Sequence, residues 1–84
     1  MIQYAAKIDI SKYGKLIRKK RVDSGLTEEQ LAEFSDLSDR EIRNIESGRS
    51  MPKLDTVLKI AYALKMDVGE LSVLIRTEEL DYVS

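Results

Sequence analysis

The spacing of apolar residues changes after the first ten positions of the chain. Within residues 1–10 every second residue belongs to an apolar set formed by Ile2, Tyr4, Ala6, Ile8 and Ile10. A period of two is typical of a half-buried strand, and a disordered or helical leader is the alternative because chain ends fray. From Ser11 onward apolar residues recur at helical spacing. The pattern therefore predicts an all-α body with a short strand at one or both ends.

Start and stop signals around the apolar stripes predict five helices. The first follows Ser11, a candidate N-cap, and stops at Ser24-Gly25, while Pro52 prevents a helix immediately before it. Capping boxes, in which Thr, Ser or Asp precedes Glu or Gln by three residues, begin at Thr27, Ser38 and Asp67. The predicted helices span about residues 12–24, 28–34, 39–47 and 54–64, with a fifth from Asp67 that buries Val68, Leu71, Leu74 and Ile75. The second helix is expected to bury Leu31, Ala32 and Phe34.

The composition excludes several kinds of chemistry. The 84 residues include no His and no Cys, so thiolate or imidazole catalysis, disulfides and ordinary zinc sites are ruled out. No apolar stretch approaches the ~20 residues that span a bilayer, and no signal sequence follows Met1. We expect a cytoplasmic protein with no metal, cofactor, small-molecule ligand or membrane contact. An enzyme has little support, because the carboxylates lie in caps and on solvated faces.

The net charge of -1 conceals a strong asymmetry along the chain. Bases exceed acids by five over residues 1–26, whereas acids exceed bases by four over residues 27–50 and by two over residues 51–84. A binding partner responds to the local field on one face of a protein rather than to the total charge. The basic first helix is therefore more informative than the overall balance.

The second and third predicted helices are short and joined by few residues, so they must cross steeply, as in a helix-turn-helix unit. On the third helix a polar arc of about 140° lies opposite the apolar residues. This arc contains Asp39, Arg40, Arg43, Asn44 and Ser47. Arg and Asn can each form two hydrogen bonds with a base edge, Arg with guanine and Asn with adenine. An ordinary solvated helix face is the alternative interpretation.

Two further features lie at the end of this helix. Glu46 is placed beside the apolar edge, where an unpaired charge is costly, and Arg21 is the best candidate for its partner because a guanidinium binds a carboxylate through two hydrogen bonds. The alternative is that both side chains point into water. The loop over residues 47–53 combines Gly48, hydroxyl groups and Arg49. Such a loop suits phosphate oxygens, and a plain turn is the alternative.

Several motifs fall at fixed spacing over residues 12–75. They are Gly14-Lys-Leu-Ile17-Arg-Lys-Lys-Arg21, Gly25-Leu26-Thr27, Gln30-Leu31-Ala32, Leu37-Ser38, Ile42-x-x-Ile45-Glu46-x-Gly48-Arg49, Pro52 and Leu58-x-Ile60-Ala61-x-Ala63-Leu64. With these motifs the chain resembles the lambda-repressor-like, XRE-type (Cro-like) helix-turn-helix family of bacterial and phage transcription regulators. The chain then divides into an N-terminal extension (1–11), a DNA-binding domain (12–75) and an acidic C-terminal tail (76–84).

The resemblance implies a five-helix fold whose third helix enters the major groove of DNA. It implies a structural salt bridge between Arg21 and Glu46. It assigns base reading to Asp39, Arg40, Arg43 and Asn44. It assigns phosphate contacts to Arg21, Thr27, Glu28, Ser38, Ser47, Arg49 and Ser50.

Two positions depart from the family pattern. Glu28 stands where Gln is common, and this places an acid beside the expected path of the DNA backbone. Asp36 stands where Gly is usual in the turn. Because Asp tolerates a left-handed conformation better than most residues, we expect the turn to survive.

The leading hypothesis is a sequence-specific DNA-binding transcription regulator, a dimeric repressor that occludes an operator in double-stranded DNA. Family members usually bind two half-sites about one DNA turn, ~34 Å, apart. The dimer would form through residues 2–10, paired with their copy or with residues 80–83, or through the fifth helix at Leu74 and Ile75. The alternative function is a protein-interaction module, antirepressor or antitoxin-like, with weak or no DNA binding, and the acidic segment 27–50 supports it.

Overall fold

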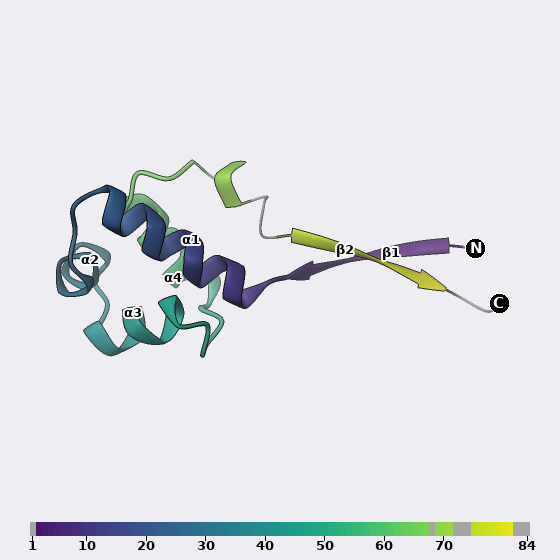
Figure 1. The fold of residues 1–84 in the computed structure, drawn as a ribbon, viewed down its shortest axis with the longest axis horizontal. Coiled ribbons are helices and arrows are strands. Elements are labelled where there is room, and N and C mark those ends of the chain that lie inside the picture. The colour runs from purple at the N-terminus through teal and green to yellow at the C-terminus, as the bar shows by residue number, and fades with distance from the viewer. Residues whose placement is uncertain (1, 68, 72–74, 82–84) are drawn as a thin grey trace.

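A helical body and a projecting two-stranded ribbon form the protein, as Figure 1 shows. The computed structural model describes residues 2–67, 69–71 and 75–81, and the molecule measures 51 × 22 × 19 Å. The elements in chain order are β1 (Ile2–Ile8), α1 (Ile10–Asp23), α2 (Glu28–Ser35), α3 (Asp39–Glu46), α4 (Leu54–Ala63) and β2 (Ile75–Asp81).

The starts of α2 and α3 follow the predicted capping boxes. Thr27 Oγ1 accepts a hydrogen bond from the Gln30 amide at 3.1 Å, and Gln30 Oε1 accepts one from the Thr27 amide at 2.9 Å. Ser38 and Glu41 form the same reciprocal pair, with both bonds at 3.1 Å. Local sequence therefore sets these two helix starts, because each side chain satisfies an amide that the helix leaves free.

The first helix begins earlier than predicted, at Ile10. Asp9 is its N-cap, since Asp9 Oδ1 accepts a hydrogen bond from the Lys12 amide at 3.0 Å. The prediction of Ser11 as N-cap is therefore wrong. A carboxylate at the positive end of a helix is a favourable cap, and it moves the helix start toward β1.

The fifth predicted helix is not present among the described residues, which contain four α-helices. Residues 69–71 form one 3₁₀ turn, in which the Glu70 amide donates to the Asp67 carbonyl at 2.9 Å. Half of the third capping box is formed, because Glu70 Oε2 accepts from the Asp67 amide at 2.8 Å. Gly69 weakens a helix at its first turn, and Ile75 belongs to β2 instead of a buried helix face. Val68 and Leu74, also predicted to be buried there, lie outside the described residues.

The ribbon confirms the strand interpretation of the period-two segment. β1 and β2 pair antiparallel, from Ile2 opposite Asp81 to Ile8 opposite Ile75. The expected pairing of residues 2–10 with the segment that begins at Leu80 is therefore present within one chain, where Gln3 lies opposite Leu80, and residues 82–83 lie outside the described residues. The ribbon extends away from the four helices along the longest axis of the molecule (Figure 1).

The core lies where the helices of the body meet. Its buried members are Tyr13, Ile17, Leu31, Ala32, Ile42, Ile45, Ile60 and Leu64. Phe34 was predicted to be in the core but is 60% exposed. On α2 the buried face is instead formed by Leu31, Ala32 and Ser35, and Phe34 lies about 100° away from its centre because helical residues advance by ~100° each.

Gly14 lets α1 approach the end of α3 closely. A Cβ atom at this position would lie 2.4 Å from the Ile45 carbonyl oxygen and 2.8 Å from that of Glu46. Both neighbours are backbone atoms, so a side chain could fit only if the helices moved apart. This contact fixes the position of the end of α3 against α1. The candidate site lies at this junction, because residues from both helices line it.

Candidate nucleic-acid interface

The outer face of α3 is polar and open. Ile42 and Ile45 are buried on the inner face, with 0% and 3% exposure, and they anchor the helix in the core. Arg40 and Arg43 are exposed on the outer face, and Asp39 and Asn44 are half-buried. The side chains proposed to read bases therefore belong to a helix whose position the core fixes.

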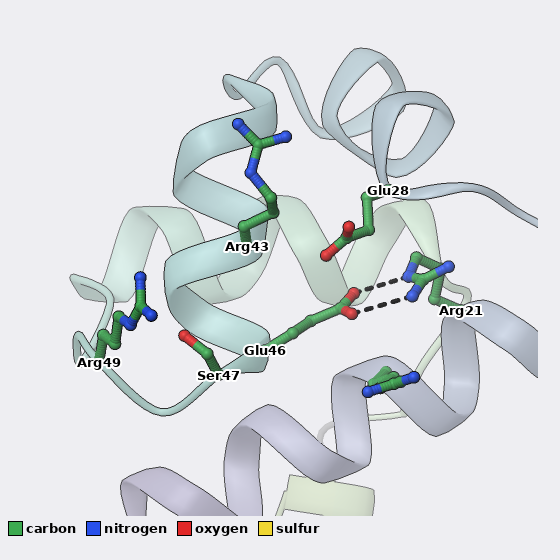
Figure 2. Close-up of a pocket in the computed structure, with 7 residues that line it drawn as sticks. Arg21, Glu28, Arg43, Glu46, Ser47 and Arg49 are labelled. Carbon is green, nitrogen blue, oxygen red and sulfur yellow. Dashed lines mark hydrogen bonds and ion pairs between the residues drawn. The ribbon is translucent and has the colours of Figure 1, made fainter.

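A buried ion pair joins α1 to the end of α3. Arg21 Nε lies 2.7 Å from Glu46 Oε2, and Arg21 Nη2 lies 3.0 Å from Glu46 Oε1. The two side chains are only 11% and 5% exposed. Figure 2 shows the guanidinium facing the carboxylate through both bonds. The Glu46 hydrogen bond raises the pKa of Arg21, and the charges of Glu46 and Glu28 raise it further.

The third nitrogen of this guanidinium is also engaged. Arg21 Nη1 donates to the Leu26 carbonyl at 2.8 Å, so the side chain ties α1 both to α3 and to the loop before α2. The sequence suggested two roles for Arg21, a structural salt bridge and a phosphate contact. Its inward geometry supports the structural role.

A basic cleft of about 360 Å³ lies between α1 and α3. Its lining residues are Arg18, Arg21, Glu28, Arg43, Glu46, Ser47 and Arg49. Since Arg21 and Glu46 neutralise each other, three arginines remain against one glutamate. Figure 2 shows Arg43, which belongs to α3, and Arg49, which belongs to the loop after α3. Both side chains extend away from the ion pair. The cleft is therefore suited to an anion.

Arg18 is a member of this cleft that the sequence did not single out. It was seen only as part of a basic helix, Lys12 to Arg21. The available signal was its position three residues before Arg21, because residues three apart lie on the same side of a helix. This spacing alone does not identify Arg18 as a cleft residue. The packing of α1 against α3 brings Arg18 beside Arg43 and Arg49.

The hydroxyl groups proposed as phosphate contacts have structural roles as well. Thr27 and Ser38 cap α2 and α3, and Ser38 Oγ also donates to Glu41 Oε1 at 3.1 Å. Ser47 Oγ donates to the Asn44 carbonyl at 3.2 Å. Ser50 lies on the opposite side of α3 from the basic cleft, in a second hollow with Asn44 and Lys53. The predicted residues thus surround α3 rather than form one pocket.

The turn between α2 and α3 survives without glycine, as expected. Asp36 adopts the left-handed conformation, with φ 55° and ψ 45°, and its amide donates to the carbonyl groups of Ala32 and Glu33. The helix-turn-helix geometry is therefore complete.

Glu28 lies in the first turn of α2 and points toward the Arg21–Glu46 pair (Figure 2). It is one of the residues that line the basic cleft. The carboxylate that stands where the family commonly has Gln therefore lies inside the cleft.

The comparisons with known proteins agree with this geometry. A family model described as helix-turn-helix matches residues 17–71. The restriction-modification controller protein C.AhdI from Aeromonas hydrophila is 35% identical, with a TM-score of 0.72 over 75% of this chain and 96% of that one. The clp gene regulator ClgR from C. glutamicum is 27% identical, with a TM-score of 0.71 over 75% and 81%. The controller protein C.Esp1396I is 26% identical, with a TM-score of 0.70 over 77% and 83%. A comparison with curated proteins finds no match.

The family match extends over more than half of the chain, so the protein belongs to the XRE-type helix-turn-helix family. It is a DNA-binding transcription regulator rather than an enzyme. Both strands of the ribbon lie outside the matched residues 17–71. Among the described residues no helix has the length and apolar character needed to cross a membrane.

Proposed function

We propose that the protein is a sequence-specific repressor that binds an operator as a homodimer and blocks access of the polymerase. The observation that carries this proposal is the combination on α3 of a buried inner face and an open outer face that bears Arg40, Arg43 and Asn44. A rigid helix with such side chains fits the major groove, which is wide enough to admit an α-helix. An operator-binding role places the protein in the cytoplasm.

The residues around α3 divide into two groups under this proposal. Asp39, Arg40, Arg43 and Asn44 read base edges. Arg18, Arg49 and the hydroxyl groups near both ends of α3 hold phosphates, which position the helix without reading sequence. Repression needs no chemistry on the DNA, because occupancy of the site is sufficient.

Glu28 has a distinct role in this arrangement. Besides Glu28 and the Arg21–Glu46 pair, the charged residues that line the cleft are Arg18, Arg43 and Arg49. The Glu28 carboxylate lowers the attraction of the cleft for any phosphate, so non-specific binding is weakened while base contacts are unchanged. Glu28→Gln is expected to raise affinity for random-sequence duplex DNA and to reduce the preference for the operator.

The direct test is selection of bound duplexes from a random pool, followed by gel-shift titration of the selected sequence. Arg40→Ala should relax base preference by about 1–3 kcal/mol, the value of a bidentate contact. Arg49→Ala should weaken all duplexes alike and flatten the salt dependence. Arg76→Ala, which removes the same charge from the ribbon, is the matched control and should change neither. Equal losses on every sequence for Arg40→Ala would refute its reading role.

The named structures provide a specific regulatory role to test. Two of the compared structures are described as restriction-modification controller proteins, and one of them is 35% identical to this chain. We propose the control of restriction-modification genes as the role to test. The selected sequence should then occur upstream of a methyltransferase or endonuclease gene in the source genome.

An interaction module on the same scaffold is the second candidate. The observation in its favour is a shallow apolar hollow lined by Phe34, Leu58 and Tyr62, which are 60%, 52% and 88% exposed. Exposed apolar patches commonly mark protein contacts. A complete absence of duplex retardation at low salt would favour this function, since even a poor DNA binder retains salt-sensitive association.

A further inference from the structure

The ribbon has two outer edges, and they differ in charge. Within the described residues each strand has one neighbour, so the far side of β1 and the far side of β2 are both without a strand partner. β2 has four charged residues in seven, whereas β1 has one, Lys7. Charged residues are a common means of protecting a strand edge from pairing, and β1 has no Pro or Gly to do so either. The edge of β1 is the one open to another strand.

The ribbon is also weak on its own. Two strands form a sheet that is marginally stable in water, and this ribbon projects from the body instead of packing along it (Figure 1). Lys7 lies directly opposite Arg76 in the register, and like charges at directly opposed positions are unfavourable. A third strand would therefore supply stability that the ribbon lacks.

We propose that the edge of β1 pairs antiparallel with β1 of a second copy of the chain, so that two ribbons form one four-stranded sheet. This inference rests on the proposed dimeric repressor and assigns its interface. An interface with two-fold symmetry must be complementary to itself. The antiparallel register that uses all seven residues is centred on Ala5 and places Ile2 opposite Ile8, Gln3 opposite Lys7, Tyr4 opposite Ala6, and Ala5 opposite its own copy.

The self-pairing of β1 places no like charges in opposition. Lys7 meets Gln3 of the second copy, and every other pair is apolar. The same operation on β2 is centred on Glu78 and sets this acid against its own copy. Self-complementarity therefore favours β1 over β2 as the strand that pairs. It also favours a second copy of the chain over an unrelated strand as the partner of β1. Both strands lie outside the residues that the family model matches, so the inference rests on the sequence and register of the ribbon itself.

A single engineered thiol tests the pairing directly. The chain has no cysteine, so Ala5→Cys introduces one thiol at the centre of the proposed interface, where opposed Cα atoms lie within disulfide reach. Under mild oxidation we expect rapid formation of a covalent dimer. Glu78→Cys is the matched control, because Glu78 lies directly opposite Ala5 in the same ribbon. Its cross-linking should be several-fold slower, and equal or faster cross-linking would overturn the proposal.

A charge substitution keeps the ribbon intact and tests the same contact. Ala5→Lys faces Glu78 within its own ribbon, which is favourable, but faces a second lysine across the two-fold axis. We expect the dimer dissociation constant from sedimentation equilibrium to rise about fivefold. Mixing this variant with Ala5→Glu should restore a dimer of the two variants, since opposite charges then meet. Glu78→Lys should leave the wild-type dimer unchanged, and a dimer that survives Ala5→Lys unaltered would contradict the pairing.

Gel shifts on random-sequence duplex at low salt separate this inference from the proposed function. If the wild type is monomeric but binds the duplex, the pairing is refuted and the DNA-binding proposal stands. If Ala5→Cys cross-links as expected but no variant retards the duplex, the pairing stands and the repressor is refuted. A dimer in which the β1 variants have no effect would place the interface elsewhere and refute the pairing alone.

Discussion

The helical body and the ribbon are built in different ways. The body is held by buried side chains such as Ile17 and Ile42 and by helix starts that the local sequence caps. The ribbon is defined by the pairing of two strands from opposite ends of the chain. The family match covers the body from residue 17 onward and includes neither strand of the ribbon. The body can therefore be compared with known proteins over most of its length, whereas the role of the ribbon is a proposal that rests on its own sequence and register.

The largest expected loss of stability comes from breaking the buried ion pair of the helical body. Glu46→Ala leaves the Arg21 guanidinium without its carboxylate at a site where both side chains are nearly buried. Loss of one partner of a buried pair costs about 3 kcal/mol, and urea denaturation should show a fall of that size. Asp23→Ala is the control, because it breaks the exposed pair with Lys19 and should cost less than about 0.5 kcal/mol. Equal costs for the two variants would mean that burial of the pair adds nothing.

A somewhat smaller loss is expected where α1 touches α3. Gly14→Ala brings a methyl group within 2.4 Å of a backbone oxygen, and overpacking of this kind typically costs about 2 kcal/mol. DNA affinity should fall as well, since α3 must shift. Gly69→Ala is the matched control, because a Cβ atom there meets nothing within 4 Å. An unfolding midpoint of Gly14→Ala equal to that of the wild type would show that the helices separate without penalty.

A third effect links the core to pH. Burial raises the pKa of Tyr13 to about 12, and its hydroxyl has no hydrogen-bond partner in the described part of the chain. The folded state favours the neutral phenol, so its contribution is complete below the unfolded pKa of about 10 and is lost as the pH rises toward 12. Tyr13→Phe should reduce this alkaline loss and raise the free energy of unfolding by about 1 kcal/mol at neutral pH. An identical pH profile for both proteins would contradict the assignment.

The smallest effect should appear in the ribbon alone. Lys7→Glu places an acid instead of a base at the register position opposite Arg76, a change that should stabilise the ribbon by about 0.5 kcal/mol. Amide hydrogen exchange in β1 and β2 should slow, while exchange in α3 stays unchanged. A uniform change across the protein would show that the ribbon and the body unfold as one unit.

The contrast between the two regions also explains what the sequence could predict. Thr27 and Ser38 act on amides three residues away, so the starts of α2 and α3 were predicted correctly. Ile75 was assigned to a helix because its strand partner, Ile8, is distant in the chain. Periodicity within one segment carries no information about such a partner.

The site shows the same limit. The polar arc of α3 follows from the spacing of its own residues, so it was predictable from the sequence. The cleft was not, because Arg18 gains its neighbours only when Gly14 brings α1 against α3. The exposure of Phe34 depends in turn on Ser35, a polar residue that takes the central place on the buried face of α2.

In the proposed dimer, the length of the ribbon determines the distance between the two helical bodies and thereby the spacing of the half-sites. A strand of seven residues spans roughly 23 Å. In a molecule 51 Å long, full overlap of two such ribbons leaves the centres of the helical bodies on the order of 50 Å apart. That separation lies about midway between one turn of duplex, ~34 Å, and two turns, ~68 Å, the spacings that present both recognition helices to the same side. A shorter ribbon would bring the two helical bodies closer together, so a shortened variant should select operators with more closely spaced half-sites.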